Sequence, residues 1–234
     1  MIILSEKNES EKVSIRKGKF RILRFRFSLR LNDVLFPVDG SELAEALTHI
    51  GYSVQPKLPP AKARMRVSFA GEIARKNGTT IDGNSDRGIL GVTAKSYDSA
   101  MATYDELRAI INNELKIDIE KRSRFFEIIA EYKFDSIKNP LKSICKTFGK
   151  TRPLKEISDI LGHKTSMYSI RLVSEGKIPN QEEWLDITID PDVIKPDSTY
   201  NIVVIFRSSQ KGIVEQFGKD LEARLSKVIG TIES

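Results

Sequence analysis

The stretch RILRFRFSLRL, Arg21–Leu31, decides the fold expected of this chain. Every odd position from 23 to 31 is apolar, and the even positions from 24 to 30 carry three arginines and one serine. A period of two residues is typical of a β-strand that has one buried face and one face toward water. We therefore predict a long strand over residues 20–31, with its arginines on the exposed face.

A second stretch, RFFEIIAEYKF (Arg124–Phe134), repeats this pattern 103 residues later without a gap. The same alternation predicts a strand with one apolar and one polar face. Its apolar face carries Phe126, Ile128, Ala130, Tyr132 and Phe134, and its polar face carries Glu127, Ile129, Glu131 and Lys133. The exposed faces of the two strands therefore differ in the sign of their charge.

An amphipathic helix is expected after each of these strands. The first begins at Ser41 and ends at Gly51, and the second begins at Asn139 and Pro140 and ends at Gly149. Ser and Asn cap helix N-termini, proline suits the first helical position, and glycine favours the C-terminal end. The two helices align at an offset of 98 residues, so the order of elements is the same in both halves.

Antiparallel strands and a long helix complete each half. In the first half we predict strands 64–73 and 89–93 around the hairpin signal Asn77-Gly78, then a helix over 96–115. In the second half we predict an additional short helix near 154–161, strands 167–173, 184–190 and 200–207, and a closing helix over about 211–229.

This order predicts an α+β protein made from an internally duplicated unit of strand, helix, three antiparallel strands and helix. The first repeat spans residues 1–118, of which 1–12 form a flexible tail, and the second spans 119–234. We expect the two repeats to join into one curved antiparallel sheet with helices on one side.

Basic residues are concentrated in two segments of the chain. Residues 12–30 contain eight Lys or Arg and no acid, and residues 57–76 contain six Lys or Arg and the single acid Glu72, whereas the whole chain has a net charge of +6. A local basic field attracts an anionic partner over a Debye length of ~10 Å.

The sequence also favours a cytoplasmic protein. The single cysteine, Cys145, excludes an internal disulfide framework and fits a reducing compartment. We expect no signal peptide and no membrane span, because no run approaches about 18 apolar residues.

The patterns of common catalytic and metal sites are incomplete. Gly149-Lys150-Thr151 matches the end of a phosphate-binding loop, but Ile144 stands where that motif needs glycine. His49 and His163 are the only histidines, and no cluster of Cys or His accompanies them. We therefore expect a non-enzymatic protein with no catalytic residues, no metal and no cofactor.

The turn Thr93-Ala94-Lys95-Ser96, between a strand and a long helix, resembles the Gly-Ala-Lys-Ser turn of the TATA-box-binding protein family. That family folds a duplicated unit of strand, helix, antiparallel strands and helix into a saddle, and the order of elements over residues 19–232 is similar. The resemblance implies a saddle-shaped sheet. At the equivalent place the second copy has Ser208-Ser209-Gln210.

The resemblance does not extend to the residues that meet DNA. The family contacts the minor groove with small and amide side chains and wedges base steps with paired phenylalanines. Here no matched phenylalanine pair is present, and the second copy exposes acids that repel phosphate. A symmetric DNA saddle is therefore not expected.

The exposed arginines of the first repeat form the candidate nucleic-acid-binding site: Arg24, Arg26, Arg30, Arg64 and Arg66. Side chains two apart on a strand repeat about every 6.7 Å, which is comparable to the phosphate spacing along one strand. We predict binding to the backbone of DNA or RNA, which positions a polymer without reading its sequence.

Two alternatives stay open. Glu127, Glu131 and Trp184 would serve a protein–protein module, with an acidic protein on the arginines or with complementary faces paired in a homodimer. The element order also allows an RNA-processing enzyme built on paired ferredoxin-like units.

Overall fold

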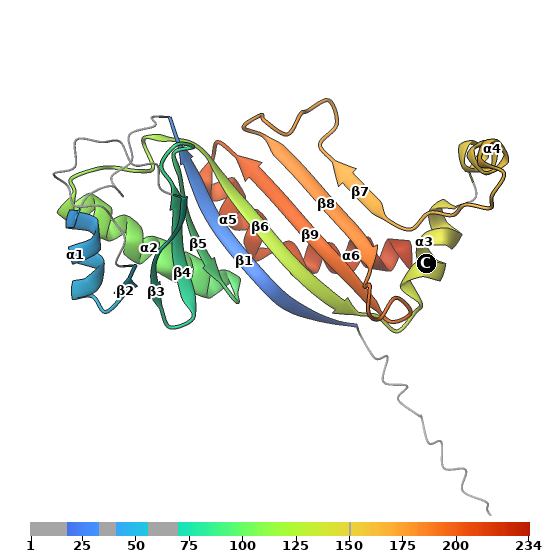
Figure 1. Cartoon of the computed structure of the whole chain (residues 1–234), viewed down its shortest axis with the longest axis horizontal. Coiled ribbons are helices and arrows are strands. Elements are labelled where there is room, and N and C mark those ends of the chain that lie inside the picture. The colour runs from blue at the N-terminus through green and yellow to red at the C-terminus, as the bar shows by residue number, and fades with distance from the viewer. Residues whose placement is uncertain (1–17, 33–40, 56–69, 150) are drawn as a thin grey trace, which may run out of the picture.

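The computed structural model describes residues 18–32, 41–55, 70–149 and 151–234 (Figure 1). In these residues, nine strands form one antiparallel sheet in the order β2-β3-β4-β5-β1-β6-β9-β8-β7, and six helices accompany it. The predicted α+β class and the single antiparallel sheet are confirmed. The predicted tail, residues 1–12, lies outside the described residues.

The elements of the first half are β1 (Lys19–Leu31), α1 (Ser41–His49), β2 (Ser53–Val54), β3 (Ala70–Lys76), β4 (Thr79–Asn84), β5 (Ile89–Ala94) and α2 (Tyr97–Glu114). Those of the second half are β6 (Ser123–Asp135), α3 (Pro140–Phe148), α4 (Arg152–Leu161), β7 (Ile170–Val173), β8 (Trp184–Pro191), β9 (Thr199–Ser208), α5 (Lys211–Lys219) and α6 (Leu221–Ile232). Helix α4 covers the segment for which the sequence predicts an additional helix, and the two-residue strand β2 was not predicted.

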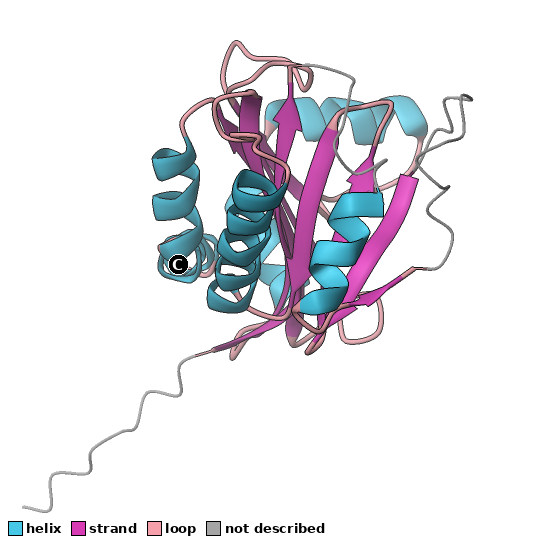
Figure 2. Ribbon diagram, turned by 90° about the vertical axis from the view of Figure 1, so that its left-hand side faces the viewer, coloured by secondary structure: helices cyan, strands magenta, loops and turns pink. Residues whose placement is uncertain are grey.

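The core lies between the sheet and helices α2, α5 and α6, which pass behind the strands in Figure 1. In the turned view of Figure 2 the strands run side by side through the middle of the molecule, with helices against them. On the core face of β1, the side chains of Phe25, Phe27 and Leu29 are at most 1% exposed. Full burial of such a side chain contributes about 1.5–3 kcal/mol, so the predicted alternation marks the face that stabilises the sheet.

The alternation breaks at Leu23, which the sequence places on the buried face and which is 46% exposed. The register between β1 and β6 shifts between Ile22 and Arg24, so Leu23 sits in a bulge. A bulge adds one unpaired residue and exchanges the two faces beyond it. Phe20 therefore takes the core side, with its ring 4.6 Å from that of Phe134.

The hairpin predicted at Asn77-Gly78 is present between β3 and β4. Asn77 has φ of 48° and Gly78 has φ of 76°. Two successive residues in the left-handed region are typical of a tight two-residue hairpin turn, which explains the Asn-Gly pair. The predicted strand 64–73 is described only from Ala70 onward.

The predicted closing helix over 211–229 is wrong as a single helix, because it divides into α5 and α6 at Asp220. Asp220 has φ −91° and ψ 0°, a conformation that ends regular helix. Its carboxylate accepts a hydrogen bond from Gln216 Nε2 at 2.8 Å. The apolar stripe nevertheless continues from Val214 to Leu221, so the spacing of apolar residues does not show where the first helix ends.

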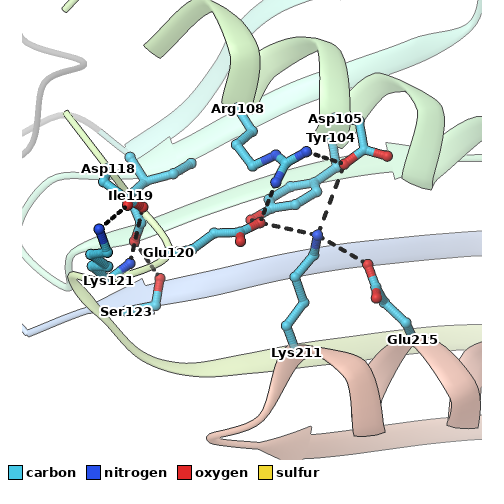
Figure 3. Close-up of polar contacts among 10 residues, drawn as sticks. All are labelled: Tyr104, Asp105, Arg108, Asp118, Ile119, Glu120, Lys121, Ser123, Lys211 and Glu215. Atoms are coloured by element: carbon cyan, nitrogen blue, oxygen red, sulfur yellow. Dashed lines mark hydrogen bonds and ion pairs between the residues drawn. The ribbon is translucent and has the colours of Figure 1, made fainter. Parts of the chain in front are cut away.

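A cluster of charged side chains joins the two halves on the helical side of the sheet (Figure 3). Lys211, at the start of α5, places Nζ 3.0 Å from Glu120 Oε1 and 3.1 Å from Glu215 Oε1. Glu120 belongs to the connector between α2 and β6, and it also accepts a hydrogen bond from the Tyr104 hydroxyl at 3.1 Å. Arg108 Nη1 lies 3.5 Å from the same carboxylate. Lys211 therefore ties the second half to the connector and to α2.

Burial shapes the protonation of this cluster. Burial alone lowers the pKa of Lys211, but its hydrogen bonds to Glu120 and Glu215 outweigh that effect and leave the pKa above its ordinary value. Burial and the Glu120 charge raise the pKa of Tyr104. Both groups therefore stay protonated at neutral pH and act as donors.

None of the helices in the described ranges combines the length and the apolar character needed to cross a membrane.

Replacing Lys211 with Met is expected to lower the free energy of unfolding by about 1–2 kcal/mol, because it leaves Glu120 and Glu215 without their shared cation. Denaturant unfolding followed by circular dichroism measures the change. Lys227→Met on the exposed side of α6 is the matched control and should change stability little. A loss equal to that of the control would contradict a linking role for Lys211.

Candidate nucleic-acid interface

The face of the sheet opposite α2, α5 and α6, which we term the open face, carries the predicted arginines of β1. In the β1–β6 register, Arg24 lies beside Glu131, Arg26 beside Ile129 and Arg30 beside Phe125. The structure thus brings the basic residues of the first half next to the acidic residues of the second. Of the five predicted arginines, Arg64 and Arg66 lie outside the described residues.

Arg24 is paired within the chain. Its Nη2 donates to Glu131 Oε1 at 2.5 Å, and the two side chains are 46% and 32% exposed. An ion pair this exposed contributes little to stability, because solvent screens it. The pair nevertheless neutralises the charge of Arg24, which the sequence predicts to contact a nucleic acid.

Arg26 is held more firmly, by Asp82 on β4. Its Nε and Nη2 donate to the two carboxylate oxygens at 3.2 and 2.6 Å, and its Nη1 donates to Ser28 Oγ at 2.9 Å. The guanidinium crosses β5 at Gly91, where a Cβ would lie 2.4 Å from Arg26 Nη2. Glycine at position 91 therefore lets the arginine lie flat on the sheet. A two-point pair of this kind has fixed geometry.

A hollow of about 450 Å³ opens on this face between β1, β5 and β6. We term it the basic hollow. Its lining contains one acid, Glu127, and four arginines: Arg26, Arg30, Arg87 and Arg207. Arg30 and Arg87 form no ion pair with any carboxylate of the described residues. These two guanidinium groups are the ones that remain available to an anion.

Arg207 forms one wall of the basic hollow and is 15% exposed. It donates to Glu127 Oε2 from Nε and Nη2 at 2.9 and 2.5 Å, and from Nη1 to the carbonyls of Pro179 and Gln181. Its guanidinium lies 4.3 Å from the centre of the Phe125 ring. Glu127 is therefore occupied by Arg207, so it opposes an incoming anion less than a free carboxylate would.

The remaining predicted interaction residue, Trp184, lies beside Arg207 in the β8–β9 register and is only 5% exposed. Next along the same face, Asp186 accepts two hydrogen bonds from Arg171 at 3.0 and 2.7 Å. Trp184 and the acids Glu127 and Glu131 thus share the open face, but Trp184 offers almost no surface to a partner.

Two residues of the basic hollow were missed at the level of sequence. Arg87 lies in the turn between β4 and β5. This turn is bonded to β1, because Leu31 N donates a hydrogen bond to Gly88 O at 2.7 Å. Only the pairing of β1 with β5 brings it near Arg30, and no local pattern gives that pairing. Arg207 could have been found, because the alternation of strand 200–207 puts it on the same face as Asn201 and Val203.

Within the part of the chain that the structure describes, no three His, Cys, Asp or Glu side chains are grouped so that they could hold a metal ion. No protein-family model and no curated protein matches the chain.

Lys133 and Asp192 form a partly buried ion pair on the open face. Nζ lies 2.6 Å from Asp192 Oδ2, and Asp192 is 6% exposed. Its other oxygen accepts the backbone N–H groups of Ile194 and Lys195, both at 3.0 Å. The hydrogen bond from Lys133, helped by these N–H groups, lowers the pKa of Asp192 below its ordinary value.

A lowered pKa in the folded state stabilises the fold above the unfolded pKa of about 3.9, and the contribution disappears as pH falls through the folded pKa. Asp192→Asn keeps an acceptor for the loop but removes the charge. At pH 7 we expect the melting temperature of this variant to be lower than that of the wild type, and we expect the difference to shrink below about pH 4. Thermal unfolding at several pH values measures the two melting temperatures, with Asp190→Asn as the control. The same difference at pH 3 and pH 7 would mean that the charge does not act.

Proposed function

We propose that this protein binds the phosphate backbone of a nucleic acid on the open face, at the basic hollow. The observation that carries the proposal is the pair Arg30 and Arg87, which lie in one hollow with no carboxylate partner among the described residues. A planar guanidinium suits phosphate because it donates two parallel hydrogen bonds. Because no carboxylate of the described residues neutralises Arg30 or Arg87, each keeps its charge for a ligand.

The same geometry favours backbone binding over base recognition. Phe125, the aromatic residue of the hollow, is 5% exposed and lies under Arg207. A base needs an accessible aromatic face for stacking, so Phe125 supports the arginines instead. Contacts to phosphate position a polymer without reading its sequence. The proposed ligand is therefore DNA or RNA bound with little base preference.

We also infer that the two halves descend from one duplicated unit and that the fold resembles the saddle of the TATA-box-binding protein family. The strand order supports this. Counted from the edge toward the centre of the sheet, β3-β4-β5-β1 of the first half corresponds to β7-β8-β9-β6 of the second half. The internal Arg24–Glu131 pair weakens the alternative of a dimer through complementary sheet faces, since these charges already neutralise each other.

Arg30→Ala and Arg87→Ala are each expected to weaken binding, and the double variant about tenfold at low salt, because each removes a phosphate contact. The slope of log K against log[salt] should become shallower by about 0.7–0.9 per arginine. Fluorescence anisotropy with labelled single- and double-stranded probes at several salt concentrations measures both quantities.

Lys227→Ala is the control, because it removes one positive charge from α6 on the helical side of the sheet. It should change affinity and slope little. Wild-type protein that binds none of the probes at low salt would disprove the proposal, and equal losses in all three single variants would place binding elsewhere.

Glu131→Gln offers a test in the opposite direction. The substitution removes an acid from the open face and releases Arg24 from its pair, so binding should tighten about two- to threefold and the salt slope should steepen. A gain in affinity cannot result from partial unfolding. Unchanged or weaker binding would argue that the ligand does not cross the β1–β6 seam.

A further inference from the structure

Beyond the basic hollow, the positive charges along the β1–β6 seam are paired within the chain. The next three basic residues along the seam each meet a carboxylate: Arg24 meets Glu131, Arg21 meets Asp135, and Lys133 meets Asp192. On the second half of the open face, Arg171 pairs with Asp186. A polymer laid along this seam would therefore meet charges that are already neutralised, and a single anionic group at the hollow would not.

Inside the basic hollow, two of the four arginines are neutralised and two are not. The ion pairs of Arg26 and Arg207 cancel their charges. Arg30 and Arg87 form no ion pair with a carboxylate of the described residues. The hollow therefore holds two uncompensated positive charges within one space of about 450 Å³.

The turn between β4 and β5 brings Arg87 to the hollow. Asn84 Oδ1 accepts a hydrogen bond from Arg87 N at 2.9 Å, and Gly88, with φ of 60°, leads the chain into β5. The bond from Leu31 N to Gly88 O holds this turn against the residue that follows Arg30. The two unpaired arginines thus reach the hollow from strand ends that are bonded to each other.

A buried hydroxyl adds an uncharged donor to the hollow. Ser28 lines the hollow and is 2% exposed. Its Oγ accepts a hydrogen bond from Arg26 Nη1 at 2.9 Å, and the described residues give its own hydrogen no acceptor. A buried hydroxyl with an unused hydrogen favours a ligand oxygen that accepts it. Arg26 borders the hollow toward β4, and Arg207 borders it on the β9 side.

We propose that the basic hollow takes the terminal phosphate of a nucleic-acid strand, which rests on the function proposed above. A phosphate monoester carries about −1.5 to −2 charge at pH 7 and three strong acceptor oxygens, whereas a diester within the strand carries a single negative charge. Arg30 and Arg87 match the dianion, because each guanidinium offers two parallel donors, and Ser28 donates to a remaining oxygen. A strand end also suits a bordered hollow, since the strand leaves it in one direction only.

Fluorescence anisotropy of the full chain tests this with single-stranded probes of one sequence that differ only at their ends. One probe carries a 5′-phosphate, one a 3′-phosphate, and one hydroxyl groups at both ends. The fluorophore sits inside the strand, so both ends stay free. We expect at least one phosphorylated probe to bind the wild type about tenfold more tightly than the hydroxyl probe at low salt, because it gains charge-assisted hydrogen bonds.

Variants locate the preference for a phosphorylated end. Arg30→Ala and Arg87→Ala should each reduce the ratio of the two affinities to below about threefold, and Arg87→Lys, which keeps the charge but not the parallel donors, should lie between Arg87→Ala and the wild type. Lys227→Ala, on the helical side of the sheet, should keep the wild-type ratio. Because the ratio compares probes on the same variant, a partly unfolded sample does not change it.

Equal binding of the three probes by the wild type would overturn the terminal-phosphate assignment and leave backbone binding standing, whereas no binding of any probe would disprove both. A full preference in Arg30→Ala and Arg87→Ala would place the phosphate elsewhere and also overturn the assignment. Adenosine monophosphate as a competitor separates a strand end from a free phosphate monoester. It should compete at least about tenfold more weakly than the unlabelled phosphorylated strand, and equal competition would overturn the assignment to a nucleic acid.

Discussion

Pairing of β1 with β6 is the interaction on which the rest of this structure depends. It joins two strands of 13 residues from opposite halves of the chain and pairs them from Lys19 and Asp135 to Leu31 and Ser123, with a register shift near each end. On the core side, the Phe27 ring stacks near that of Phe126 at 6.2 Å. Without this pairing each half would present a long open edge with unpaired N–H and C=O groups. The ion pairs around Lys211 hold the same junction from the helical side.

The same pairing determines which charges on the open face stay free. Alternation along β1 and β6 identifies the exposed side chains, and the sequence predicts these faces correctly for most positions. It does not tell which strand lies next to which, because strand pairing arises from contacts far apart in the chain. Arg24 meets Glu131, and Arg26 reaches Asp82 two strands away. A stripe of arginines that looks uniform in the sequence therefore divides into paired and unpaired members.

The errors of the sequence-based prediction have local physical causes. A bulge at Leu23 moves one apolar side chain to the exposed side, and no period of two residues can reveal where a strand slips. Asp220, with φ −91° and ψ 0°, ends α5 although the apolar stripe continues through it, and the spacing of apolar residues gives no sign of such a break. Arg87 reaches the candidate site only through the β1–β5 pairing. Periodicity thus predicts faces well, whereas bulges, helix breaks and neighbours depend on single residues and on tertiary contacts.

The free arginine of β1 is explained by its neighbours across the sheet. Arg30 lies between Phe125 on β6 and Ile89 on β5, and neither offers a carboxylate. Its guanidinium lies 5.9 Å from the centre of the Phe125 ring, within the distance at which a cation is attracted to an aromatic face. The aliphatic stem can lie on the apolar surface while the charged head stays in water. An arginine held in this way loses little conformational entropy when an anion binds. The apolar neighbours on β5 and β6 therefore offer Arg30 no carboxylate, and they position its guanidinium for an external anion.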